Sequence, residues 1–155
     1  VNLFGETYPD VDLVALVDFD NDSVGTSLQC CEALGDKLWG VRLDTSETLV
    51  DKSIVPIMQN FKPVGVTPRL VEMTRQTLDN LGYGHVKIIA SGGFNPDRIS
   101  EFDKRRVPVD AYGVGSYLMR GVNAFTADVV LLEGKPCAKV GRQYTPNPHL
   151  ELVRL

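Results

Sequence analysis

The sequence predicts an α/β protein built on a parallel β-sheet, with a β-hairpin near its C-terminal end. Four short apolar runs have the character of strands, and a helical pattern lies between successive runs; the runs are Asp12–Asp18, Leu38–Asp44, Val86–Ala90 and Val109–Val114. Each run is nearly continuous in apolar residues, which is typical of strands buried on both faces. The alternation of strands and helices requires right-handed parallel crossovers.

The number of strands and the chain length together indicate an incomplete barrel. Four parallel strands leave two open sheet edges, which a barrel would close. A whole (β/α) barrel takes roughly 250 residues, whereas this chain has 155. We therefore expect residues 1–122 to form half of an irregular, TIM-like α/β barrel and residues 123–155 to form a hairpin and tail.

Three helices are predicted between the strands. Ser23–Lys37 carries apolar residues at a spacing of three to four, which is the helical period. Thr67 followed by Pro68 is a helix start, with threonine at the N-cap and proline in the first turn, and Gly82 ends that helix. Asn95–Asp97 repeats the start signal before the last strand.

Two further segments have predictable structure. Thr45–Val66 is longer than a normal connection from strand to helix, so we expect a loop with a short helix there. Phe125–Leu132 and Pro136–Val140 flank Glu133–Pro136, which is a hairpin signal.

The composition narrows the class of partner. The formal net charge is −4 and no Lys/Arg run is present, so neither nucleic acid nor an anionic membrane is indicated. No apolar run approaches the ~20 residues of a membrane span.

The cysteine content indicates the redox state. Cys30 and Cys31 are adjacent, and Cys137 makes the number of cysteines odd. We expect free thiols, no structural metal site and a reducing, cytoplasmic compartment.

Two glycine-rich segments follow consecutive predicted strands. Their candidate anion-binding residues are Ser91, Gly92, Gly93, Gly113, Gly115 and Ser116. Glycine lets the backbone turn its N–H groups toward one point, and a following helix adds its dipole. Either segment alone is explained equally well by a tight turn. Two of them on neighbouring strands favour a phosphate site, as barrels commonly have between their last strands.

Three charged residues lie at or near the ends of the first two strands. Asp18 and Asp44 are carboxylates that face the same crevice, where they could hold ribose hydroxyls or a Mg²⁺ that carries pyrophosphate. Arg42 lies two residues before Asp44, so both side chains point to the same face. The alternative is a structural ion pair of Arg42 with either carboxylate.

Four motifs together resemble the nicotinate phosphoribosyltransferase family, in particular its shorter prokaryotic-type members. The motifs are VRLDTSE (41–47), VKIIASGGFNPDRI (86–99), VPVDAYGVGSYL (107–118) and LLEGKPCAKVGR (131–142). They occur in the order of the family between about Leu13 and Arg142. Many members have RLDSGD where this chain has RLDTSE, so the glycine of that loop is absent here.

The resemblance implies a fold, a set of partners and a role for each candidate site residue. The barrel would join an N-terminal β-rich domain, on which residues 123–155 would dock, in a homo-oligomer. Arg42 would approach the pyridine carboxylate, Asp44 the ribose and the reacting centre, and Asp18 would line the same pocket. The six glycine and serine residues of the two segments above would bind the 5′-phosphate.

The implied reaction forms nicotinate mononucleotide and pyrophosphate from nicotinate and phosphoribosyl pyrophosphate, as a step of NAD biosynthesis. Mg²⁺ would accompany the pyrophosphate, and ATP would be a co-substrate that acts through a phosphorylated histidine upstream of Val1. Neither His85 nor His149 matches that histidine, so we expect residues 1–155 alone to be inactive. Quinolinate or nicotinamide phosphoribosyltransferases, or a phosphate-binding barrel without catalysis, are the alternatives.

Overall fold

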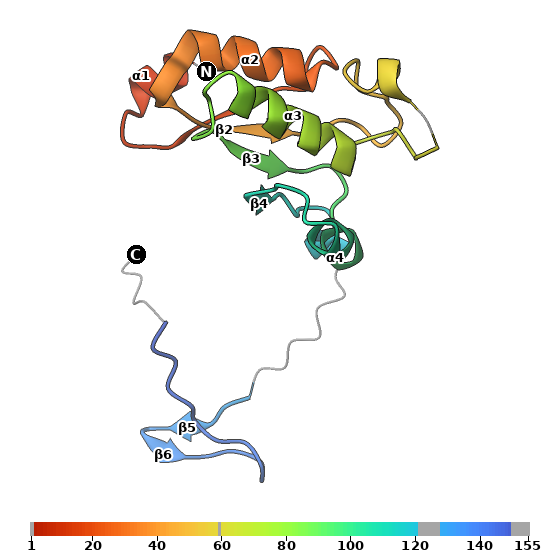
Figure 1. The fold of residues 1–155 in the computed structure, drawn as a ribbon. Coiled ribbons are helices and arrows are strands. Elements are labelled where there is room, and N and C mark those ends of the chain that lie inside the picture. Colours follow the sequence, from red (N-terminus) through yellow and green to blue (C-terminus); the bar gives the residue numbers. More distant parts are fainter. Residues whose placement is uncertain (1, 59, 121–127, 150–155) are drawn as a thin grey trace. The chain divides into compact units, whose positions relative to one another are not determined.

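The computed structural model describes residues 2–58, 60–120 and 128–149. The chain divides into two compact units, Val1–Gly121 and Val122–Leu155, which are described separately. The helices and strands of the first unit are α1 (Asn2–Thr7), β1 (Leu13–Leu16), α2 (Ser23–Leu34), β2 (Leu38–Leu43), α3 (Pro68–Asn80), β3 (Lys87–Ala90), α4 (Pro96–Lys104) and β4 (Ala111–Tyr112) (Figure 1). Short 3₁₀ turns are η1 (Gly35–Lys37), η2 (Val55–Ile57) and η3 (Leu118–Arg120).

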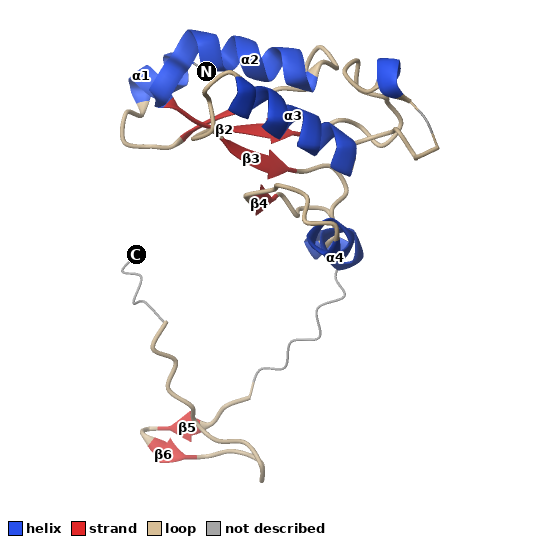
Figure 2. Ribbon diagram, viewed as in Figure 1, coloured by secondary structure: helices blue, strands red, loops and turns tan. Residues whose placement is uncertain are grey.

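The strands of the first unit form one parallel sheet in the order β1-β2-β3-β4 (Figure 2). The predicted parallel α/β arrangement is therefore confirmed. One row of paired residues runs across the whole sheet, through Leu16, Arg42, Ile89 and Ala111. Because the strands are parallel and in register, the polar residues that follow them lie along one edge of the sheet.

The core lies between the sheet and helices α2 and α3, which cover one face (Figure 2). The strand residues on this face are fully buried; they are Ala15, Val17, Val41, Leu43, Ile88 and Ala90. On the other face Val14 and Leu16 are 39% and 47% exposed, and Arg42 is exposed. The prediction that the strands are buried on both faces is therefore wrong for this chain.

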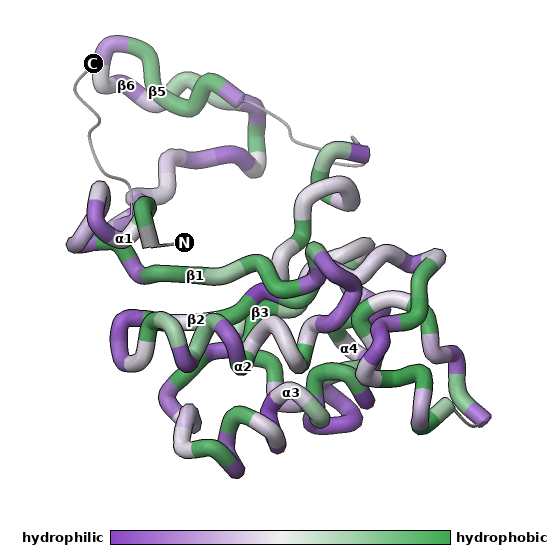
Figure 3. The backbone as a smooth tube through the Cα atoms, turned by 90° about the horizontal axis from the view of Figure 1, so that it is seen from above, coloured by the Kyte–Doolittle hydropathy of each residue, from purple (hydrophilic) through white to green (hydrophobic). Residues whose placement is uncertain are grey.

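The reason is that successive side chains of a strand point to opposite faces. In an apolar run, every second side chain therefore packs against α2 and α3. The side chains between them, which are equally apolar, lie on the other face of the sheet. Figure 3 shows the apolar character along β1. Trp39, for which its strand position suggests core packing, is also 38% exposed.

The predicted helix starts are confirmed. The Thr67 hydroxyl accepts a hydrogen bond from the Leu70 amide at 3.1 Å, and the Asn95 side chain accepts one from the Arg98 amide at 2.9 Å. Each cap satisfies a backbone donor that would otherwise have no helical partner. Gly82, with φ +85°, follows the end of α3.

Other segments differ in detail from the prediction. The helix from Ser23 ends at Leu34 and continues as η1, and α1 has no counterpart in the predicted elements. The long excursion contains η2, as predicted. The segment after β4 was expected to begin a helix, but within residues 2–58, 60–120 and 128–149 it leads only to the single turn η3.

The second unit contains the predicted hairpin. β5 (Leu131–Leu132) pairs antiparallel with β6 (Lys135–Pro136), and Glu133 and Gly134 make the turn with positive φ. The strands are shorter than predicted, and the start of the run at Phe125 lies outside the described residues. Proline in β6 cannot donate to a ladder, which limits its length.

Candidate functional site

The ends of β2 and β3 are joined by Ser91. Its hydroxyl lies 2.9 Å from Oδ1 of Asp44 and 3.0 Å from the Leu43 carbonyl oxygen, and its amide donates to the same carbonyl at 2.9 Å. Ser91 is buried. A hydroxyl has one proton and can donate to only one acceptor at a time, so the hydroxyl is shared between the backbone and the Asp44 carboxylate.

The end of β4 approaches the same serine closely. The Gly113 amide donates to the Ala90 carbonyl oxygen at 2.8 Å. A Cβ atom on Gly113 would lie only 2.8 Å from Cβ of Ser91, which is closer than two carbon atoms can pack. Glycine is therefore required here by the approach of two strand ends, and Asp44, Ser91 and Gly113 form one continuous contact.

Four backbone amides at these strand ends are free of internal partners. In the part of the chain that the structure describes, the amides of Gly92, Gly93, Gly115 and Ser116 donate no hydrogen bond. Gly92 and Gly93 have φ of +86° and +69°, a region that glycine adopts without strain. We refer to these four amides as the glycine cradle. Backbone N–H groups at glycine-rich strand ends are suited to binding anions.

Asp18 lies two residues after the last residue of β1, Leu16. Its Oδ1 is buried and has no hydrogen-bond partner among the described residues. Burial raises the pKa of the Asp18 carboxyl, its own backbone amide opposes that shift, and the Asp44 charge adds to it, while Arg42 lowers it again. The charges of Asp44 and Arg42 thus both act on the Asp18 carboxyl.

Arg42 projects from the open face of the sheet. The Val17 amide donates to its carbonyl oxygen at 3.2 Å, which fixes the backbone between β1 and β2. Its guanidinium forms no ion pair with any described carboxylate, so the structural pairs with Asp18 or Asp44 are not made. The cation is therefore available to an anionic ligand on this face.

Sequence reasoning missed Asp51, which is fully buried. Its carboxylate accepts from the Ser23 amide at 2.9 Å, the Ser23 hydroxyl at 2.7 Å and the Ser53 amide at 2.9 Å. A protein carboxylate thus occupies the N-terminus of α2, where it complements the helix dipole. Ser23 and Asp51 are 28 residues apart, so no local sequence signal indicates their contact.

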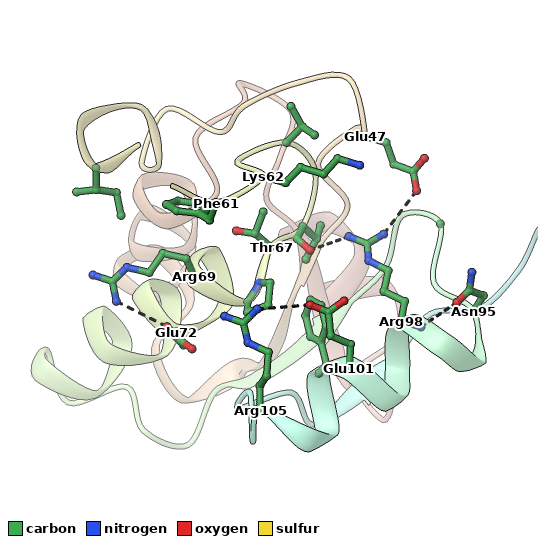
Figure 4. A pocket seen from close by; sticks show the side chains of 16 residues that line it. Glu47, Phe61, Lys62, Thr67, Arg69, Glu72, Asn95, Arg98, Glu101 and Arg105 are labelled. Carbon is green, nitrogen blue, oxygen red and sulfur yellow. Dashed lines mark hydrogen bonds and ion pairs between the residues drawn. The ribbon is translucent and has the colours of Figure 1, made fainter. Parts of the chain in front are cut away.

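Sequence reasoning also missed Arg98, on the first turn of α4. It lies beside the glycine cradle and in the wall of a pocket of about 770 Å³ (Figure 4). The other cations in this wall include Arg69 and Arg105, which pair with neighbouring glutamates at 3.7 and 3.4 Å. The pocket contacts Gly93 but not Asp44, so it borders the cradle and does not contain the candidate reacting centre.

Three or more potential metal ligands do not gather at any point in residues 2–58, 60–120 and 128–149. The free Oδ1 of Asp18 and the carboxylate of Asp44 fit a different role, because Mg²⁺ is usually held by one or two carboxylates together with substrate phosphates. Among the described helices, none combines the length and hydropathy that crossing a bilayer requires.

Comparison with known proteins places this site in context. No family model matches the chain. The chain is 31% identical over 128 residues to nicotinate phosphoribosyltransferase pncB1 of Mycobacterium tuberculosis, in two strains; the match covers 80% of this chain and 24% of that protein. The crystal structure of nicotinate-nucleotide pyrophosphorylase from Pyrococcus furiosus superposes with a TM-score of 0.57 and 36% identity, over 86% of this chain and 30% of that one.

The chain is therefore related to the phosphoribosyltransferases, and its parallel sheet matches part of one solved structure of that class. Within that class, the chain is a distant relative of the nicotinate phosphoribosyltransferases, which confirms the resemblance of its motifs. It spans about a quarter of the length of the curated relatives that it matches.

Proposed function

We propose that this chain is part of a nicotinate phosphoribosyltransferase, which forms nicotinate mononucleotide and pyrophosphate from nicotinate and phosphoribosyl pyrophosphate with ATP as co-substrate. One observation carries the proposal: the Asp44 carboxylate, bonded to Ser91, lies beside the glycine cradle. A carboxylate next to an anion site is what the transfer of a phosphorylated ribose requires, because positive charge develops on the ribose while its phosphate is held.

The site residues have the following proposed roles. The cradle amides, together with Ser91 and Gly113 at its base, hold the 5′-phosphate. Asp44 lies beside the ribose and stabilises its transition state, and Asp18 lines the same pocket. Arg42, which forms no ion pair with the described residues, binds the pyridine carboxylate.

The reaction needs little covalent chemistry from the protein. The bond from ribose C1 to pyrophosphate breaks as the bond from C1 to the nicotinate nitrogen forms. The transition state resembles an oxocarbenium ion, which a fixed carboxylate stabilises electrostatically. Asp18 and Asp44 would hold a Mg²⁺ that accompanies the pyrophosphate, and this ion would supply positive charge to the leaving group.

We further propose that residues 1–122 form half of the barrel and that residues 123–155 dock on a β-rich domain of the complete protein. The described side chains of the second unit support this, because apolar residues such as Val140 and Tyr144 are 98% and 58% exposed. Residues 1–155 alone should then have no transferase activity, since most of the base pocket and the ATP-linked histidine would lie elsewhere.

The test is a coupled assay of the complete protein with nicotinate, nicotinamide and quinolinate in turn, each with phosphoribosyl pyrophosphate and Mg²⁺, with and without ATP. Turnover of nicotinate alone supports the proposal. Preference for quinolinate would show that the base is misassigned. The absence of turnover with all three bases would leave a phosphate-binding barrel without this chemistry.

Substitution of the candidate carboxylate makes the test specific. Asp44→Asn should lower kcat by roughly 100-fold or more, the usual effect of removing one preorganised electrostatic group. Asp36→Asn is the matched control, because Asp36 is exposed in η1, and it should leave kcat unchanged. Equal kcat for Asp44→Asn and the unsubstituted protein would rule out the role given to Asp44.

A second candidate function, that of a quinolinate phosphoribosyltransferase, remains beside the first, and the comparison of structures bears on it. The P. furiosus nicotinate-nucleotide pyrophosphorylase shares 36% identity with this chain. Its name also refers to a nicotinate nucleotide and pyrophosphate, so the phosphate and ribose sites proposed above would serve either activity. The assay with three bases separates the two candidates.

A further inference from the structure

Arg98 extends from α4 back across the segment that connects β3 to this helix. Its Nη1 donates to the Gly92 carbonyl oxygen, and its Nη2 donates to the Val66 carbonyl oxygen at 2.7 Å. Nη1 also lies 3.6 Å from Oε1 of Glu47. One guanidinium thus joins the loop after β2, the end of the long excursion and the glycine segment (Figure 4).

The guanidinium is also packed against an aromatic ring. Its central carbon lies 4.3 Å from the centroid of the Phe94 ring, which is buried in the core. A cation over an aromatic face gains electrostatic attraction, and the planar group can stack there while its edges donate hydrogen bonds. Burial lowers the pKa of Arg98, and Glu47 opposes that shift; arginine stays protonated in proteins. Only the planar guanidinium of arginine can stack on Phe94 and donate to two carbonyl oxygens at once.

The bond to the Gly92 carbonyl has a consequence for the glycine cradle. The carbonyl of Gly92 and the amide of Gly93 belong to one planar, trans peptide group, in which C=O and N–H point in opposite directions. When Arg98 holds the carbonyl oxygen toward α4, the Gly93 N–H is directed away from α4. Gly92 and Gly93 both have positive φ, and glycine has the widest choice of backbone conformations, so this segment needs an external constraint.

We propose that Arg98 is a positioning residue that sets the orientation of the Gly92–Gly93 peptide and thereby preorganises the phosphate site. The inference rests on the proposed function, in that the cradle is taken to bind the phosphate of phosphoribosyl pyrophosphate. Arg98 acts through the peptide plane and does not contact the phosphate. One charge-assisted hydrogen bond holds the Gly92 carbonyl, and a second ties Arg98 to the Val66 carbonyl. The amides of the cradle gain from being fixed before the ligand arrives.

The experiment compares three variants of the complete protein. Arg98→Gln removes the positive charge and the planar guanidinium with its several N–H donors. Arg98→Lys keeps the charge but cannot donate to two carbonyls in a fixed geometry. Arg105→Gln is the matched control, because Arg105 is exposed at the C-terminal cap of the same helix and pairs only with Glu101 among the described residues. Hydrogen exchange of the segment 91–95, affinity for inorganic phosphate and the kinetic constants for phosphoribosyl pyrophosphate are measured for each.

For Arg98→Gln and Arg98→Lys we expect faster exchange of the Ser91 amide, which is the amide of segment 91–95 that donates a hydrogen bond among the described residues. We also expect a roughly tenfold loss of phosphate affinity and a similar rise in KM for phosphoribosyl pyrophosphate. The change in kcat should be smaller than the change in KM, and Arg105→Gln should match the unsubstituted protein. Unchanged exchange and affinity in Arg98→Lys would overturn the proposal, since charge alone would then suffice. Arg98→Lys also decides the matter if Arg98→Gln does not fold.

The proposed function and this inference can fail separately. If the unsubstituted protein has no transferase activity, the proposed function is contradicted. Hydrogen exchange and phosphate affinity would still show whether Arg98 positions the glycine segment. Conversely, normal transferase activity with no effect of either Arg98 variant on exchange or affinity would contradict the positioning role alone.

Discussion

Replacing Gly113 with alanine introduces one methyl group at the point where the ends of β3 and β4 meet. The new Cβ would lie 2.8 Å from Cβ of Ser91 and 3.7 Å from its Cα. Ordinary carbon contacts begin near 3.4 Å, so the two strand ends must separate by about 0.6 Å, the difference between 3.4 and 2.8 Å. Ser91 cannot move freely, because its amide and hydroxyl are bonded to the Leu43 carbonyl.

Overpacking of this kind costs about 1–3 kcal/mol. Gly115→Ala is the control on the same loop, because a Cβ there would meet nothing within 4 Å. It should leave the stability unchanged or raise it by about 0.4–1 kcal/mol, through the reduced conformational freedom of the unfolded chain. The predicted difference between the two alanine variants is therefore at least about 1 kcal/mol.

The assay is urea unfolding followed by far-ultraviolet circular dichroism, with the m-value compared to confirm that the unfolded states are similar. Ser91→Gly removes the clashing Cβ, so in that background Gly113→Ala should cost less than about 0.5 kcal/mol, and the double-mutant cycle should show coupling of about 1 kcal/mol or more. Equal stability of Gly113→Ala and Gly115→Ala, or additive effects with Ser91→Gly, would refute the close approach of these strand ends.

Two further predictions concern stability. Burial raises the pKa of Asp18, so its ionisation opposes folding: stability is full below the unfolded pKa of 3.8 and is lost as pH rises through the folded pKa. Asp18→Asn should therefore raise Tm at pH 7, with the gain disappearing in acid; a lower Tm at pH 7 would contradict this. Thr67→Ala removes the cap of α3 and should cost about 1 kcal/mol in urea unfolding, whereas Thr77→Ala, inside the same helix, should cost less.

The elements that the sequence predicted correctly depend on interactions close in the chain. Thr67 and Asn95 each bond an amide three residues ahead, and the hairpin turn at Glu133 and Gly134 is equally local. These signals are visible in any window of a few residues. The positions of the four parallel strands were predicted correctly for the same reason. A short apolar run between glycine and polar residues is typical of a buried strand.

The errors arose where the environment of a segment decides its burial. An apolar strand is equally compatible with one or two covered faces, so the run at Leu13–Leu16 could not show that Val14 and Leu16 are exposed. Each glycine-rich strand end is predicted to open a helix, but after Gly115 only η3 follows among the described residues. Neither outcome depends on the local sequence alone.

The candidate site divides in the same way. The glycine segments and the charged residues Asp18, Arg42 and Asp44 could be identified from their positions after predicted strands, because parallel strands bring their ends to one edge. Their roles stay predictions. The contacts that organise them join residues far apart: 47 positions separate Ser91 from Asp44, and 32 separate Arg98 from Val66.

The sequence by itself thus determined the order of the elements, their caps and the edge at which polar groups gather, because these follow from local hydrogen bonding and from the periodicity of side chains. Only the tertiary structure decided that Ser91 shares its hydroxyl with Asp44, that Gly113 has no room for a Cβ and that Arg98 holds the Gly92 carbonyl. Such contacts depend on distances of a few ångström between segments, which the packing of α3 and α4 against the sheet fixes and no pattern of residues along the chain specifies.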